Sequence, residues 1–124
     1  SLDMQYYPIV NELIQGYYSL ESKPKRVTVS SISNQLKISV KALEKMPRCM
    51  ELIENSTEIT EVFWIREMVW QYKQLLAEGI QVTISNLAKR PLNLSREDIL
   101  RTIPYFRDDE YHFAIKEIIC NTYL

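Results

Sequence analysis

The sequence predicts an all-α protein with two tandem helix-turn-helix units, and three observations support this fold class. Only two glycines occur in 124 residues, whereas an all-β chain needs many tight turns and usually more glycine. Apolar residues recur at three- and four-residue spacing, as on the buried face of a helix. Segments 27–47 and 82–104 also follow one common scheme. We therefore expect about eight helices, with two three-helix units joined by a long helix.

The first unit, residues 1–55, contains the residue types that start helices. Pro8 suits the first turn of a helix and precedes an amphipathic run. Thr28 and Ser39 each precede a short apolar segment, where a hydroxyl can accept a hydrogen bond from a free backbone amide. The helices expected in this unit are Pro8–Leu20, Val29–Leu36, Val40–Met46 and Arg48–Asn55.

The second unit, residues 56–124, repeats this order. Gly79 ends a long amphipathic helix, Thr83 and Ser95 cap two short helices, and Pro91 ends the first of these. A terminal helix begins with the acidic residues at 108–110. The helices expected in this unit are Thr57–Glu78, Ile84–Arg90, Arg96–Ile103 and Asp108–Asn121.

The two units resemble each other residue by residue. Both read Val-Thr-aliphatic-Ser, a short helix, aliphatic-Ser, a second helix and aliphatic-Pro. The offset between paired positions grows from 55 to 57 residues, which indicates two small insertions. The paired positions are Thr28 with Thr83, Ser39 with Ser95, Leu43 with Leu100, Met46 with Ile103 and Pro47 with Pro104.

Charge is segregated along the chain. The net charge is −1, but residues 22–48 hold seven basic residues and one acidic residue, a net of +6. Residues 79–107 hold five basic and two acidic residues, a net of +3. Local positive charge of this kind suits a phosphate backbone, because neutralising phosphates releases counterions.

In a helix-turn-helix the second helix enters the major groove of DNA, and the start of the preceding helix faces phosphates. Arg96 is the first candidate for a base contact, because arginine is the commonest reader of guanine. The alternative for each candidate is an ordinary solvated helix face. The candidate DNA-binding residues are Arg26, Thr28, Ser39, Val40, Lys41, Lys45, Thr83, Arg90, Ser95, Arg96 and Arg101.

The sequence does not predict an enzyme, a cofactor or a metal site. It lacks the common nucleophile, phosphate-loop and dinucleotide motifs. His112 follows an acidic stretch that suits a helix start, and Cys49 and Cys120 belong to no CxxC pair. We expect two free thiols in a cytoplasmic protein, with no membrane segment.

The repeated motifs resemble the C-terminal region of transposon target-selection proteins of the TnsD/TniQ group. The segments Thr28 to Pro47 and Thr83 to Pro104 carry this resemblance, which covers most of residues 8–122. It implies tandem helix-turn-helix units that recognise an insertion site on double-stranded DNA in a bacterial, nucleoid-associated protein. It also implies contacts with other transposition proteins through an N-terminal region. We expect the chain to be a C-terminal fragment, because it begins with Ser-Leu and lacks that family's zinc-binding region.

Two other functions remain open from the sequence. A helical protein-protein adaptor would use the basic blocks to dock an acidic partner, with tyrosine and tryptophan side chains at the contact. A transcription regulator would use the same helix-turn-helix units on DNA. The repeat favours DNA binding, whereas the near-neutral net charge and the acidic residues Glu44, Glu97 and Asp98 favour the adaptor.

Overall fold

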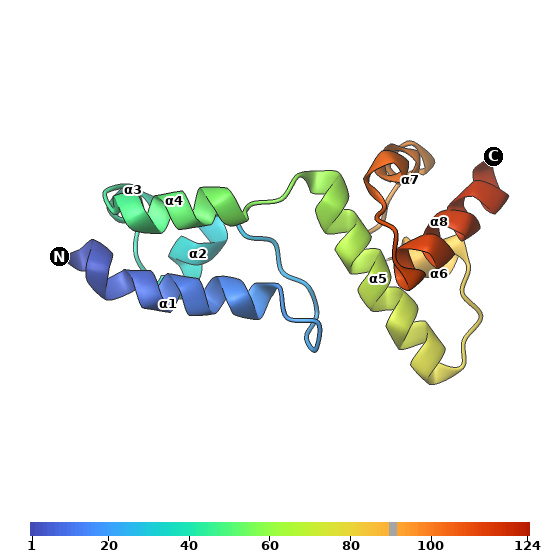
Figure 1. Cartoon of the computed structure of the whole chain (residues 1–124), viewed down its shortest axis with the longest axis horizontal. Helices are drawn as coiled ribbons and strands as arrows, with labels where there is room; N and C mark the ends of the chain where they lie inside the picture. The colour runs from blue at the N-terminus through green and yellow to red at the C-terminus, as the bar shows by residue number, and fades with distance from the viewer. Residues whose placement is uncertain (90–91) are drawn as a thin grey trace. The chain divides into compact units, whose positions relative to one another are not determined.

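The computed structural model describes residues 1–89 and 92–124, which divide into two compact units, Ser1–Glu58 and Ile59–Leu124 (Figure 1). The described residues form eight α-helices, one 3₁₀ helix and no strand. The predicted all-α fold with about eight helices is therefore confirmed.

In the first unit, α1 and α4 lie side by side, and α2 and α3 form the helix-turn-helix beside them (Figure 1). Residues from all four helices, together with Val27 in the preceding loop, close one apolar core. The hydroxyl of Tyr18 also donates a hydrogen bond to the carbonyl of Ser56, which ties the loop after α1 to the end of α4. The helices of this unit are α1 (Leu2–Tyr17), α2 (Val29–Leu36), α3 (Val40–Glu44) and α4 (Pro47–Ser56).

In the second unit the long helix α5 packs against α6, α7 and α8. The buried residues of α5 in this core are Ile65, Met68 and Leu75. Each of the other three helices adds at least one buried apolar residue to the same core. The helices are α5 (Thr60–Glu78), α6 (Ile84–Leu87), α7 (Arg96–Thr102), the 3₁₀ helix η1 (Ile103–Tyr105) and α8 (Glu110–Tyr123).

The predicted start of the first helix was wrong. Helix α1 begins at Leu2, because the side chain of Ser1 accepts a hydrogen bond from the Met4 amide at 3.3 Å. Pro8 lies inside the helix rather than at its first position. It is exposed, and its missing N–H leaves one helical hydrogen bond unmade.

Several other predicted helix ends also moved. Helix α6 stops at Leu87 rather than Arg90, and Arg90 and Pro91 lie outside the described residues. Helix α3 ends at Glu44 rather than Met46, whose side chain is buried in the core. The last helix runs over Glu110–Tyr123, because Asp109 caps it by accepting a hydrogen bond from the His112 amide.

Burial corrects the alignment of the two units. Leu43 and Ile99 are both buried, as are Met46 and Thr102, so each pair keeps the 56-residue offset of Ser39 and Ser95. The sequence pairing of Leu43 with Leu100, and of Met46 with Ile103, was wrong. It followed the prolines Pro47 and Pro104, which lie just beyond the second helix in each unit.

The two turns use residues other than glycine at a left-handed position. Lys37 has φ 59° and Asn93 has φ 50°. Each lies two residues before the serine that caps the next helix. Asparagine tolerates this conformation better than most residues, whereas lysine is strained in it. The shared geometry supports the sequence repeat at the level of the backbone.

A side chain from α1 caps α4. Met46, the residue before α4, offers no side-chain cap. Instead, the two carboxylate oxygens of Asp3 accept hydrogen bonds from the backbone amides of Arg48 at 2.9 Å and Cys49 at 3.0 Å. Desolvation opposes ionisation of Asp3, but these amides and the Arg48 charge together hold the pKa of its carboxyl below the usual value.

We expect Asp3→Asn to lower the melting temperature of the first unit, because α4 loses a charged acceptor at its positive end. The same interaction should weaken as pH falls through the lowered pKa of Asp3, below its ordinary 3.8. Circular dichroism monitors helix in both units, whereas both tryptophans, Trp64 and Trp70, lie in the second. A circular dichroism transition that moves while tryptophan emission stays constant identifies the first unit. Glu12→Gln, on the same helix, is the control, and an equal effect there contradicts the cap.

The histidine of the second unit is structural. His112 is 7% exposed, and its Nδ1 accepts a hydrogen bond from the Arg107 amide at 2.9 Å. Its ring and that of Phe106 form a T-shaped pair, with centroids 5.6 Å apart. Burial lowers the pKa of His112 below the ordinary 6.5, although the nearby Asp109 carboxylate opposes this.

Because the folded pKa of His112 lies below the unfolded one, the unfolded chain takes up a proton first as pH falls. The neutral ring therefore stabilises the second unit fully above pH 6.5, and this stabilisation is lost as pH drops through the folded pKa. Denaturant titrations followed by tryptophan emission should give a lower midpoint at about pH 5.5 than at about pH 7.5. His112→Asn should reduce this difference, and an undiminished difference would assign it to other groups.

Candidate nucleic-acid interface

The helix-turn-helix of the first unit is held by hydroxyl caps. The Thr28 hydroxyl accepts a hydrogen bond from the Ser31 amide at 2.9 Å, and the Ser31 hydroxyl accepts one from the Thr28 amide at 3.0 Å. The exposed Ser39 hydroxyl accepts a bond from the Ala42 amide at 3.0 Å. Thr28 and Ser39 therefore set where α2 and α3 begin, whatever else they contact.

Exposed lysines surround α3. Lys41 lies on the helix, Lys45 follows its last residue and Lys37 occupies the turn before it; all three are exposed. Within residues 1–89 and 92–124, no carboxylate lies within ion-pair distance of these three ammonium groups. The acidic residue closest to these lysines in the sequence is Glu44, which is also exposed on α3. The turn and α3 therefore carry a net positive, unneutralised charge.

Two further candidates flank this group. Val40, the first residue of α3, is 38% exposed, so an apolar surface lies beside the lysines. Arg26 is half-buried, and its backbone carbonyl accepts a hydrogen bond from the Ser31 hydroxyl at 3.0 Å. The loop before α2 is thereby joined to the first turn of that helix.

The second unit repeats the caps. The Thr83 hydroxyl accepts a hydrogen bond from the Asn86 amide at 3.3 Å. The Ser95 hydroxyl accepts one from the Asp98 amide at 3.1 Å. In turn, the Asp98 carboxylate accepts a hydrogen bond from the Ser95 amide at 3.3 Å. Arg96, next along the chain, is exposed, with its guanidinium 5.6 Å from the centre of the Tyr123 ring.

Arg101 differs from the lysines of the first unit. Its guanidinium lies 3.1 Å from a carboxylate oxygen of Asp98 and 3.3 Å from one of Glu61, and 5.2 Å from the centre of the Trp64 ring. Its side chain is still 54% exposed. Two carboxylates and an aromatic face thus compete with any phosphate for this group.

The structure brings together some of the predicted residues. Ser39, Val40, Lys41 and Lys45 gather on and around α3. In the other unit, Arg96 and Arg101 belong to α7, and Ser95 caps that helix. Arg90 lies outside the described residues.

Sequence reasoning missed two features of these helices. The first is Lys37, whose position in the turn was available from its place two residues before the capping Ser39. The second is the contact of Glu61 with Arg101, which joins residues 40 positions apart and left no local signal.

The described part of the chain meets the requirements of neither a metal site nor a membrane-spanning helix. No group of three or more histidine, cysteine, aspartate or glutamate residues there has the arrangement of a metal site. None of the helices there combines the length and apolar character that crossing a membrane requires. Both cysteines are free, Cys49 fully buried and Cys120 half-buried.

Comparison of the chain with known proteins finds no matching family model, no similar curated protein and no similar solved structure.

The capping role of Ser95 makes a quantitative prediction. Ser95→Ala should destabilise the second unit by about 1 kcal/mol, because the Asp98 amide loses its acceptor. Ser85→Ala is the matched control, because Ser85 is an exposed residue of α6. Denaturant unfolding followed by tryptophan emission measures both variants. Equal stability of the two would show that the Ser95 cap contributes nothing.

Proposed function

We propose that this chain binds double-stranded DNA sequence-specifically through its helix-turn-helix units, with the first unit as the principal contact. The observation that carries the proposal is the group of unneutralised lysines at the turn and second helix of the first unit. Lysines in this position contact phosphates, whose counterions are released on binding. The exposed Val40 adds an apolar surface of the kind that contacts a thymine methyl group in the major groove.

The caps support the same proposal. A helix that enters the major groove must present its first residues at a defined angle. The bond from the Ala42 amide to Ser39, together with burial of Leu43, fixes α3 against the core. The exposed side chains of Val40 and Lys41 are thus carried on a rigid element.

The second unit contributes less charge in this proposal. The exposed Arg96 of its second helix lies over the Tyr123 ring, and Arg101 is engaged by Asp98 and Glu61. The resemblance of the repeated motifs to transposon target selectors supplies the biological setting that we propose, which is recognition of an insertion site in DNA transposition.

The proposal is tested by titrating the affinity for duplex DNA against salt. We expect wild-type affinity to fall steeply with salt, and Lys37→Gln/Lys41→Gln/Lys45→Gln to reduce the slope by up to about 2.7, or about 0.9 per lost phosphate contact. Affinity at low salt should fall by about tenfold or more. Lys116→Gln, an exposed lysine of α8, is the control. Absence of wild-type binding at about 50 mM salt would refute DNA binding.

The Arg101 contact makes a separate prediction about the second unit. Glu61→Gln removes one of its two carboxylate partners and should raise DNA affinity at low salt by a few-fold, with a slope larger by up to about 0.9. Arg101→Gln should abolish this gain in the double variant. If Glu61→Gln binds DNA as wild type does, α7 does not contact the phosphate backbone through Arg101.

A further inference from the structure

Glu44 is the only acidic residue in the basic segment 22–48, and it is the last residue of α3. Its side chain is exposed. In the part of the chain that the structure describes, residues 1–89 and 92–124, no hydrogen bond or ion pair engages its carboxylate, although Lys45 is its neighbour in the sequence. The carboxylate is therefore available to a partner outside the fold.

The fold gains nothing from this carboxylate. The carbonyl groups at the end of a helix carry partial negative charge, so an acidic side chain in the last turn is destabilising. The corresponding residue of the second unit, at the 56-residue offset shared by Ser39 and Ser95, is the half-buried Leu100. The scaffold that the two units share thus does not require an acid here, which points to a role in what the first unit binds.

Glu44 shares the exposed face of α3 with residues that we propose to contact DNA. Residues advance by about 100° around a helix, so Glu44 lies between Val40 and Lys41 around the axis, one turn further along. All three side chains are exposed, whereas Leu43 is fully buried and marks the side that faces the core. A duplex that contacts Val40 and Lys41 is therefore also close to Glu44.

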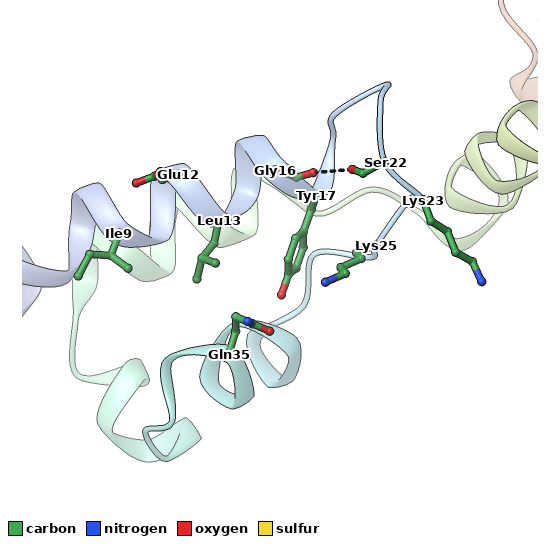
Figure 2. A pocket seen from close by; sticks show the side chains of 9 residues that line it. All are labelled: Ile9, Glu12, Leu13, Gly16, Tyr17, Ser22, Lys23, Lys25 and Gln35. Carbon is green, nitrogen blue, oxygen red and sulfur yellow. Dashed lines mark hydrogen bonds between the residues drawn. The ribbon is translucent and has the colours of Figure 1, made fainter.

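Gln35, on the preceding helix, belongs to another surface. It is exposed, and glutamine is also a residue that reads bases. It lies on the side of α2 that faces α1, where it lines a groove with residues of that helix (Figure 2). Among the described residues, none of α3 lines this groove. The face of α3 thus offers Glu44, rather than Gln35, for a base contact.

A carboxylate on a face that contacts DNA has a specific consequence. It repels the phosphates of any duplex, so it lowers affinity unless it accepts a hydrogen bond. In the major groove the donors are the exocyclic amino groups of cytosine and adenine, and cytosine N4 is the usual partner of glutamate. The surrounding lysines neutralise phosphates, so they supply affinity while the carboxylate discriminates between bases.

We propose that Glu44 determines part of the sequence specificity of the first unit, by accepting a hydrogen bond from the N4 amino group of a cytosine in the major groove. This inference rests on the proposed DNA binding and adds one base that the site must contain. Lys41 and Lys45 contribute affinity on every sequence, whereas Glu44 lowers affinity for duplexes that lack cytosine at this position.

The test uses the full chain and a library of duplexes with a randomised segment, from which bound sequences are selected and read. Wild type should enrich a cytosine at one position of the site. Replacing that base pair should lower wild-type affinity about fivefold or more. Glu44→Ala should lose the preference at this position alone. It should bind random duplex DNA at least as tightly as wild type, because a repelling charge is removed.

Two further variants sharpen the result. Glu44→Gln should change the preferred base at the same position from cytosine to adenine, because glutamine pairs with adenine N6 and N7. Glu54→Ala is the control, because it removes the same charge from an exposed position of α4 in the same unit. It should leave every base preference unchanged. Thermal unfolding followed by circular dichroism verifies that each variant is folded.

The outcomes separate this inference from the proposed function. If wild type binds no duplex at about 50 mM salt, DNA binding itself is refuted, and the role of Glu44 with it. If wild type selects a site but Glu44→Ala keeps the same base preferences, only the role of Glu44 is overturned. An equal loss of preference in Glu54→Ala also overturns it, because the effect then belongs to net charge and not to a base contact.

Discussion

The structure depends on burial of very short helices against long ones. Helix α3 has five residues and α6 has four, far fewer than the roughly 12 that an isolated helix needs in water. They persist because Leu43 and Leu87 are fully buried in the two cores. In addition, a capping hydroxyl accepts a hydrogen bond from a free backbone amide in the first turn of each short helix. The orientation of each helix-turn-helix is therefore a property of its whole unit.

The two units share a scaffold but differ in charge. Around α3 the exposed lysines stand without carboxylate partners in the described residues, whereas Arg101 of α7 has two. An ion pair at the surface is weak, but its carboxylates compete with a phosphate for the arginine. A repeat that preserves buried positions and caps can thus vary its affinity through a few exposed residues, which supports unequal roles for the two units in our proposal.

The sequence predicted the fold well where the signals are local. Caps, apolar spacing and the repeat identified the helices, because each depends on residues a few positions apart. The start of α1 was missed, because Pro8 resembles a first helical residue and the Ser1 cap lies at the end of the chain. The Asp3 cap of α4 and the pairing of Arg101 with Glu61 join residues 45 and 40 positions apart. Such contacts arise only from packing, so the availability of each candidate side chain could not be read from the sequence.

The bond network at the start of α4 also determines the chemistry of Cys49. Its thiol is fully buried and lies 3.6 Å from the Asp3 carbonyl. Burial, together with the Asp3 contact, raises the pKa of Cys49 to about 12. The thiolate is the form that attacks an alkylating reagent, so at neutral pH this cysteine should react only when the first unit opens. With Cys120 replaced by serine, the alkylation rate would measure the opening of the first unit in the intact chain.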